Sequence, residues 1–168
     1  VSKSYLNPHY TIMSNVLGTT NLLESLRFFK KECKVIIITS DKCYDNIETL
    51  WGYKETDKMG GKDIYSASKG AVLTLTLAMA TDHLPDGIRV NAVNPATTDT
   101  PWIKKLLDLS DDANAARVAL EARQPMGKLI SPAEIANAIL FLASPLQASI
   151  TGTTLSIDGG MHSLRIPK

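Results

Sequence analysis

The feature that most constrains the fold of this chain is an apolar run rich in β-branched residues, Val35-Ile36-Ile37-Ile38-Thr39. The run does not alternate with polar residues, which is typical of a strand covered on both faces, as in parallel sheets. A parallel neighbour needs a long crossover connection, usually a helix. The sequence around the run is therefore expected to alternate helices with further strands.

The rest of the chain supplies that alternation. Helices are expected at 7–31, 65–83, 102–109, 113–123 and 135–143, and strands at 35–39, 88–93 and 153–157. Asn7 and Pro8 suit the start of the first helix, whose apolar positions recur at helical spacing. Those positions are Ile12, Val16, Leu23, Leu26 and Phe29. The order predicts an α/β fold, with right-handed crossovers and a three-stranded parallel sheet.

Short motifs mark where several of these elements begin and end. Ser131-Pro132-Ala133-Glu134 has the pattern of a capping box, with proline at the first helical position. Pro85-Asp86-Gly87 predicts a turn after the helix at 65–83, and Asn94-Pro95 closes the second expected strand. The segment 96–130 is a long connection containing the two short helices.

Composition excludes several classes of protein. The 168 residues fit one domain, 44% of them are apolar, and the net charge of +1 gives no electrostatic attraction to nucleic acid or to acidic membranes. The two cysteines have no metal-site spacing, and the histidines are isolated, so we expect reduced thiols and no metal. We expect a cytoplasmic protein with no membrane segment.

Tyr65 and Lys69 are the strongest indication of chemistry. Their spacing places a phenol and an ammonium on one helical face, one turn apart. The lysine charge favours the phenolate and is expected to lower the tyrosine pKa toward neutrality, which makes Tyr65 a candidate for proton transfer. The pair alone is a weak motif, so its meaning depends on the sequence around it.

With this context the chain resembles the short-chain dehydrogenase/reductase superfamily along almost its whole length. Residues 1–70 resemble the nucleotide-sugar branch, closest to CDP-glucose 4,6-dehydratases. The matching segments are Asn15-Val16-Leu17-Gly18-Thr19, Thr39-Ser40-Asp41-Lys42-Cys43-Tyr44-Asp45-Asn46, Trp51-Gly52-Tyr53, Met59-Gly60-Gly61 and Tyr65-Ser66-Ala67-Ser68-Lys69-Gly70.

Residues 65–168 are instead similar to the single-domain branch, near sugar and polyol dehydrogenases. The matching segments are Arg89-Val90-Asn91-Ala92-Val93-Asn94-Pro95-Ala96, Thr100-Pro101-Trp102, Gly127-Lys128-Leu129, Thr151-Gly152 and Asp158-Gly159-Gly160. Both branches share the segment around Tyr65 and Lys69. A junction of two branches near 65–70, natural or designed, is the resulting hypothesis.

The resemblance implies a catalytic set. Tyr65 would exchange the hydroxyl proton, and Lys69 would lower the pKa of Tyr65 and hold the nicotinamide ribose. Ser40 would hydrogen-bond the substrate oxygen, and Asn15 would hold a water that links Lys69 to solvent. Taken alone, Ser40 is equally consistent with a turn residue and Asn15 with a solvated helix position.

Further roles follow from the same resemblance. In the dehydratase interpretation, Asp41 would protonate the leaving hydroxyl, and Lys42 would stand where related sugar dehydratases carry a glutamate base. The segment from Pro95 would contact the nicotinamide through the backbone of Thr98 and the side chain of Thr100. Ala96 replaces the glycine usual in this loop, which is expected to cost on the order of 1 kcal/mol if the position needs φ > 0.

A Gly-rich phosphate-binding loop is missing from the sequence, whose ten glycines are scattered. We therefore expect residues 1–168 to form one incomplete, Rossmann-like domain that carries the nicotinamide half of an NAD or NADP site. The apolar strand at 35–39 would then have one edge without its family neighbour. A homo-oligomer, or a partner that supplies the missing strands, is expected to cover that edge.

Three functions remain open at this point. The first, which the resemblance implies, is NAD(P)-dependent oxidation or reduction of a small-molecule substrate, a sugar-like or other secondary alcohol, with little or no activity expected of the isolated chain. The second is a CDP-glucose 4,6-dehydratase-like lyase. The third is a catalytically silent half-Rossmann scaffold that self-associates without binding a dinucleotide.

Overall fold

The computed structural model describes residues 2–28, 33–40, 63–161 and 164. Its helices are α1 (Ser2–Leu6), α2 (Pro8–Ile12), η1 (Met13–Leu17), α3 (Gly18–Ser25), η2 (Leu26–Phe28), α4 (Ile64–Asp82), η4 (Leu84–Asp86), α5 (Pro101–Leu107), α6 (Ala113–Glu121), α7 (Pro132–Ala143) and η5 (Pro145–Gln147). Its strands are β1 (Lys34–Ile38), β2 (Arg89–Pro95) and β3 (Thr154–Ile157). The expected α/β fold is confirmed.

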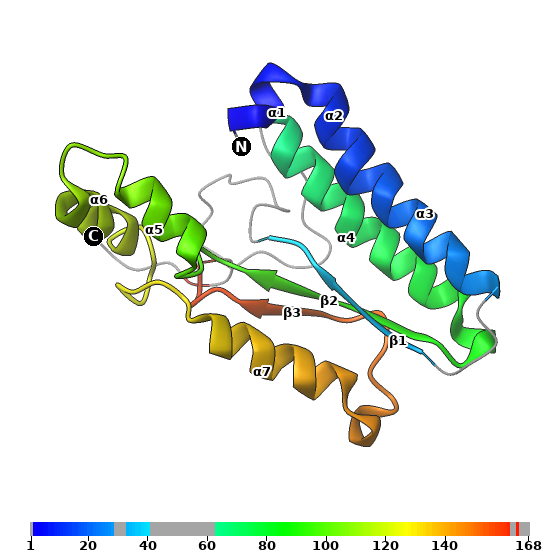
Figure 1. The fold of residues 1–168 in the computed structure, drawn as a ribbon. Coiled ribbons are helices and arrows are strands. Elements are labelled where there is room, and N and C mark those ends of the chain that lie inside the picture. The colour runs from blue at the N-terminus through cyan, green and yellow to red at the C-terminus, as the bar shows by residue number, and fades with distance from the viewer. Residues whose placement is uncertain (1, 29–32, 41–62, 162–163, 165–168) are drawn as a thin grey trace.

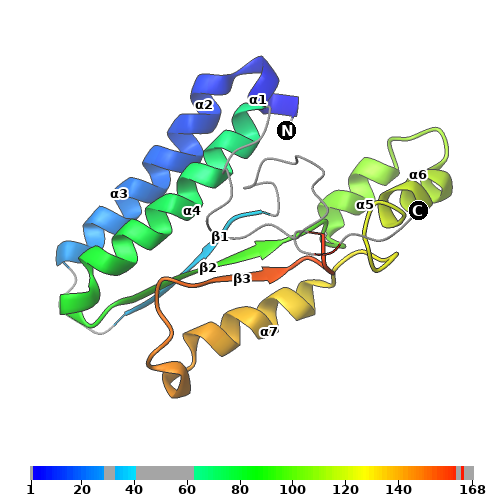
Figure 2. The ribbon, with the colours of Figure 1, turned by 180° about the vertical axis from the view of Figure 1, so that it is seen from behind.

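The strands form a parallel sheet in the order β1-β2-β3. Helices α1–α4 lie on one face of the sheet and α7 lies on the other, while α5 and α6 lie beyond the carboxyl ends of β2 and β3 (Figure 1). The view from behind shows the same three layers (Figure 2). The predicted three-stranded parallel sheet with flanking helices is therefore present.

Two apolar clusters hold the layers together. The cluster between the sheet and the α3–α4 pair comprises Leu23, Ile37, Val72, Leu73, Met79, Ala80, Ile88, Val90 and Ala92. The cluster under α7 comprises Val93, Ala96, Ile130, Ile135 and Leu142. Because successive side chains of β2 point to opposite faces, β2 contributes to both clusters and is the central strand.

Strand β1 is less enclosed than its sequence suggests. Ile37 is buried, but Ile38 is 54% exposed on the opposite face. Among the described residues β1 pairs with β2 and with no other strand. The expectation that both faces of this run are fully covered is therefore wrong for its C-terminal end, although Ile36 packs against the apolar residues under α7.

The first helical segment contains an irregularity that its sequence pattern did not predict. Asn7 caps α2 as expected, accepting a hydrogen bond from the Tyr10 amide at 3.0 Å. Residues Met13–Leu17 then form a π-helical turn, η1. A π turn inserts an extra residue and rotates the buried face of the helix. As a result Thr11 is buried whereas Ile12, predicted to face the core, is 36% exposed.

The capping box that begins α7 is confirmed. The Glu134 amide donates to Ser131 Oγ at 3.2 Å, and the Ser131 amide donates to Glu134 Oε2 at 2.8 Å. The hydrogen bond from the Ser131 backbone lowers the pKa of the Glu134 carboxyl from its ordinary value. The α7 N-terminus thus satisfies two of its free amides locally.

We expect Ser131→Ala to lower the free energy of unfolding by about 1 kcal/mol, because α7 loses its N-cap acceptor. The measurement is urea unfolding followed by circular dichroism. Ser131→Thr, which keeps the hydroxyl, is the matched control and should lose less than half as much. An equal loss in the two variants would show that the capping hydroxyl is not what stabilises α7.

Candidate active site

The N-terminus of α4 positions the tyrosine and lysine side chains. Asp63 caps the helix, accepting hydrogen bonds from the Ser66 amide and the Ser66 hydroxyl, each at 3.0 Å. Lys69 Nζ lies over the Tyr65 ring at 5.7 Å from its centroid, within the range of a cation–π contact. The predicted pairing of Tyr65 with Lys69 on one helical face is therefore seen in the structure.

Asn15 reaches the same helix from the π-helical turn η1. Its Nδ2 donates to Ser68 Oγ at 2.9 Å, and Ser68 Oγ donates to the Tyr65 carbonyl at 2.7 Å. Ser68 is fully buried, so this chain of hydrogen bonds ties η1 firmly to the first turns of α4. Asn15 thus lies beside the segment that carries Tyr65 and Lys69, and no sequence pattern predicts its hydrogen bond to Ser68.

Ser40 is brought to the same region by the end of β1. The preceding residue, Thr39, donates from its amide to the Val93 carbonyl at 3.0 Å and from its hydroxyl to the Lys69 carbonyl at 3.2 Å. Ser40 itself is buried. The contacts of Thr39 fix the carboxyl end of β1 against α4, one turn of backbone from the tyrosine. Asp41 and Lys42 lie outside the described residues.

The loop after β2 contains the three residues predicted to contact a nicotinamide. Pro95 is the last residue of β2, so this strand continues through the dipeptide that was expected to close it. Thr98 forms a parallel bridge with Ile130, and its hydroxyl donates to the Ala96 carbonyl at 3.1 Å. Thr100 Oγ1 caps α5, accepting from the Ile103 amide at 3.4 Å.

Two buried amide side chains near this loop were not predicted. Asn94 is 1% exposed, and its Oδ1 accepts no hydrogen bond from the described residues. Gln124 donates to Thr97 Oγ1 at 3.3 Å, while its Oε1 has no partner in the described part of the chain. A buried oxygen without a donor is unusual and indicates a place that a bound group or water would complete. No sequence pattern distinguishes these amides from ordinary core polar residues.

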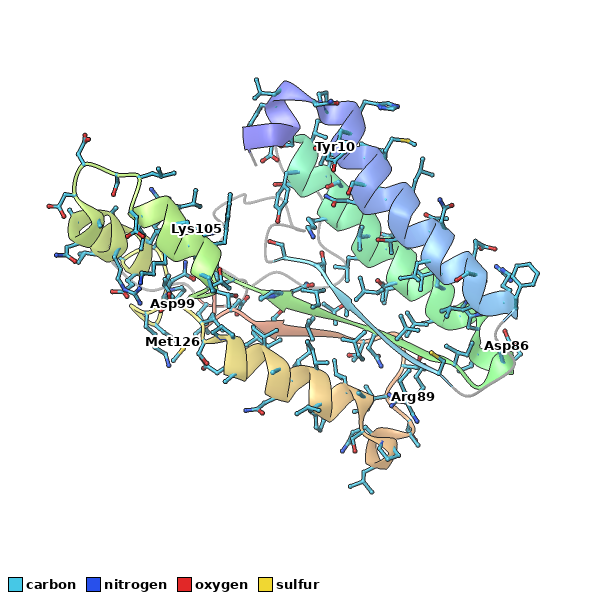
Figure 3. All side chains as sticks on the ribbon, in the orientation of Figure 1. Tyr10, Asp86, Arg89, Asp99, Lys105 and Met126 are labelled. Atoms are coloured by element: carbon cyan, nitrogen blue, oxygen red, sulfur yellow. The ribbon has the colours of Figure 1, made fainter. Side chains whose placement is uncertain are left out.

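An ion pair also joins this loop to α6. Arg117 contacts Asp99 through two nitrogen–oxygen pairs, Nη2–Oδ2 at 2.7 Å and Nη1–Oδ1 at 3.4 Å. The guanidinium hydrogen bond holds the pKa of the Asp99 carboxyl below its usual range, and Asp99 in turn raises the pKa of Arg117. Asp99 lies at the base of α5 (Figure 3). Arg117 and Asp99 are distant in sequence, so only the fold reveals their contact.

These residues gather at the carboxyl edge of the sheet. Ser40 follows β1, the Pro95–Thr100 segment follows β2, and the start of α4 returns to the same edge with Tyr65 and Lys69. In open α/β sheets this edge is where ligands bind. These groups are chemically compatible with a nicotinamide, since a phenol–ammonium pair and a buried hydroxyl lie at this edge, and Asn94 near the end of β2 has a buried amide oxygen without a donor among the described residues.

Other kinds of site have less support within the described residues. No group of three or more potential metal ligands occurs among them. Cys33 is a free thiol, and Cys43 lies outside the described part of the chain. None of the described helices combines the length and the apolar character that crossing a membrane would require.

Comparison with known proteins identifies the class. A family model described as enoyl-(acyl carrier protein) reductase matches residues 13–162. This range includes Asn15, Ser40, Tyr65, Lys69 and the loop after β2. The chain belongs to this family of short-chain dehydrogenases/reductases.

Individual relatives agree with this assignment. A rat protein, dehydrogenase/reductase SDR family member 6, is 42% identical over 97 residues, which cover 58% of this chain and 40% of the relative. A cyclopentanol dehydrogenase from a Comamonas strain is 34% identical over 149 residues, covering 89% of this chain and 53% of the relative. The chain spans about 40% of the length of the first curated relatives it matches.

A solved structure shows the same arrangement of elements. ElxO with NADP bound is 28% identical, with a TM-score of 0.65, over 88% of this chain and 54% of ElxO. The predicted Rossmann-like class is thereby confirmed. The resemblance of residues 1–70 to CDP-glucose 4,6-dehydratases, and the junction near 65–70, stay predictions.

Proposed function

We propose that this chain carries the catalytic part of a short-chain dehydrogenase/reductase that oxidises or reduces a sugar-like or other secondary alcohol with NAD or NADP. The observation that supports this most is the convergence of Tyr65 and Lys69 with Ser40 and Asn15 at the carboxyl edge of the sheet. The Lys69–Tyr65 contact of 5.7 Å provides the charge that a reactive phenol needs.

Each side chain has a role in this proposal. Tyr65 Oη takes the proton from the substrate hydroxyl during oxidation and returns it during reduction. Lys69 favours the phenolate through its positive charge. Ser40 donates a hydrogen bond to the substrate oxygen, and the hydrogen bond from Asn15 to Ser68 keeps the Tyr65–Lys69 turn in place. A nicotinamide, when bound, supplies or accepts the hydride.

The relatives support the substrate class and the cofactor. Cyclopentanol, named in one relative, is a secondary alcohol whose oxidation releases one proton and one hydride. ElxO, whose structure was solved with NADP bound, aligns with 88% of this chain at a TM-score of 0.65. We propose that Pro95, Thr98 and Thr100 lie against the nicotinamide end of the cofactor. In the same proposal, another copy of the chain or a partner chain holds the adenosine end of the cofactor. The protein is also proposed to be cytoplasmic.

The test is a titration of the purified chain with NADH and with NADPH, followed by nicotinamide fluorescence and accompanied by sizing. Saturable binding on the order of micromolar supports the oxidoreductase. A folded chain that binds neither cofactor contradicts it and favours the silent scaffold. Sizing decides the proposed self-association, because a sharply monomeric species at high concentration would exclude it.

The lyase remains a separate hypothesis. Its distinguishing residues, Asp41 and Lys42, lie outside the described part of the chain, and no relative reported above is named as a dehydratase. Formation of a 4-keto-6-deoxy product from CDP-glucose, lost on Asp41→Asn, would favour the lyase over the alcohol oxidoreductase.

A further inference from the structure

The segment 96–100 is held in place on one side by hydrogen bonds with Ile130 and Gln124. The Asp99 amide donates to the Ile130 carbonyl at 2.8 Å, and the Ile130 amide donates to the Thr97 carbonyl at 3.0 Å. The Gln124 side chain also reaches Thr97. These hydrogen bonds fix the backbone of residues 97–99 against Ile130. None of them reaches the point where the segment meets α5, so side chains must hold that point.

Arg117 supplies the contact at that junction. Three of its guanidinium atoms are engaged, because besides the two contacts with Asp99 its Nε donates to Glu121 Oε1 at 2.9 Å. Glu121 lies one turn further along α6, so it orients the guanidinium for Asp99. Asp99 itself lies at the base of α5, which also carries Lys105 (Figure 3).

The geometry distinguishes this ion pair from an ordinary surface pair. The Arg117 and Asp99 side chains are 42% and 40% exposed, and exposed pairs usually contribute little. Here, however, the guanidinium and the carboxylate meet as two parallel forks, which is the strongest and most directional arrangement. The pair also closes a ring that contains α5 and the start of α6, so it restrains those elements as a unit.

We propose that Arg117 is a positioning residue that clamps the loop between β2 and α5 and so sets the place of Thr98 and Thr100. Thr98 lies immediately before Asp99 and Thr100 immediately after it, so a shift of the Asp99 carboxylate moves both. The clamp itself rests on the structure alone. Its effect on cofactor binding rests on the proposed function, in which these threonines lie against the nicotinamide.

Arg117 and Asp99 keep their opposite charges over a wide range of pH, so the ion pair persists. The hydrogen bond from Arg117 lowers the pKa of Asp99, and Asp99 raises the pKa of Arg117. Both groups therefore stay charged well to either side of neutral pH. No other charged side chain from the described residues is hydrogen-bonded to Asp99, so removal of Arg117 leaves the carboxylate without a fixed partner.

Hydrogen exchange of the whole chain tests the clamp directly. We expect Arg117→Met to speed exchange of the amides in 99–107 by roughly two- to fivefold, the effect of losing an interaction of up to about 1 kcal/mol. Asp99→Asn should give a similar change, and the double variant little more. Arg117→Lys, which keeps the charge without the fork, should fall between. Arg123→Met, which removes an exposed cation two residues beyond Glu121, is the matched control.

The second measurement concerns the cofactor. In a chain that binds NADPH, Arg117→Met should weaken binding by a similar two- to fivefold and leave turnover at saturating cofactor unchanged. Equal exchange in Arg117→Met and Arg123→Met would overturn the clamp. Faster exchange with unchanged NADPH affinity would overturn its link to the cofactor. If the unaltered chain binds no NADPH, the proposed function fails, while the exchange comparison still decides the clamp.

Discussion

Tyr65→Phe is expected to lower turnover of a secondary alcohol at least 100-fold while leaving the fold intact, the magnitude typical of losing a general acid–base group. The substitution removes only the phenolic oxygen, and the ring can still stack under the Lys69 ammonium, which lies 5.7 Å from its centroid. The measurement is the rate of NAD+ or NADP+ reduction with cyclopentanol at saturating cofactor, with circular dichroism as the check on folding.

Tyr5→Phe is the matched control, because Tyr5 is 68% exposed and lies in α1. Its turnover should stay within a factor of two of the unaltered chain. If Tyr65→Phe behaves like Tyr5→Phe in an active chain, Tyr65 is not the proton-transfer group.

The pH dependence of the Lys69→Met variant tests the role of the lysine independently. Without the ammonium the phenolate is less favoured, so the rise of the oxidation rate with pH should move to higher pH.

Sequence patterns predicted a structural feature correctly wherever the residues that determine it lie close together along the chain. The apolar run before Thr39 predicted β1, and the spacing of Tyr65 and Lys69 predicted their contact. The capping pattern predicted the start of α7 within the Ser131–Glu134 segment, and both bonds of the box are present. In each case the interaction depends on one turn or one strand, which local periodicity describes well.

The features that sequence patterns missed depend on contacts between distant segments. Asn15 meets Ser68 across 53 residues, and Arg117 meets Asp99 across 18. Only the packing of η1 on α4, and of α6 beside the loop after β2, brings these groups together. The π turn that contains Asn15 is likewise invisible to a pattern that assumes 3.6 residues per turn. The site was therefore predicted as a set of residues, without the contacts that fix it.

Arg89→Met is expected to lower the free energy of unfolding by roughly 3 kcal/mol, since charged donors to buried carbonyls contribute more than neutral ones. Arg89 is buried, and its guanidinium donates to the carbonyls of Leu142 and Ile150, each at 2.8 Å, and of Ser144 at 3.2 Å. The carbonyls of Leu142 and Ser144 lie at the C-terminus of α7, where a positive charge also interacts favourably with the helix dipole. Urea unfolding measures the loss.

The control for Arg89→Met is Arg123→Met, which removes an exposed arginine and should stay within about 0.5 kcal/mol of the unaltered chain. Arg89 begins β2 next to the end of α7 (Figure 3), so its contacts join the central strand to the helix layer that covers it. A loss in Arg89→Met no greater than in the control would mean that packing alone holds α7 on the sheet.

A double substitution separates the hydrogen bonds of Arg89 from its packing. Asn91 Nδ2 also donates to the Ile150 carbonyl, at 3.0 Å, so this oxygen keeps one donor when either side chain is removed. In Arg89→Met combined with Asn91→Ala it loses both. The combined loss should therefore exceed the sum of the single losses by about 1–3 kcal/mol, the cost of a buried oxygen without a donor. Strict additivity would show that water or another group satisfies Ile150, and that Arg89 stabilises the fold through its remaining two carbonyls.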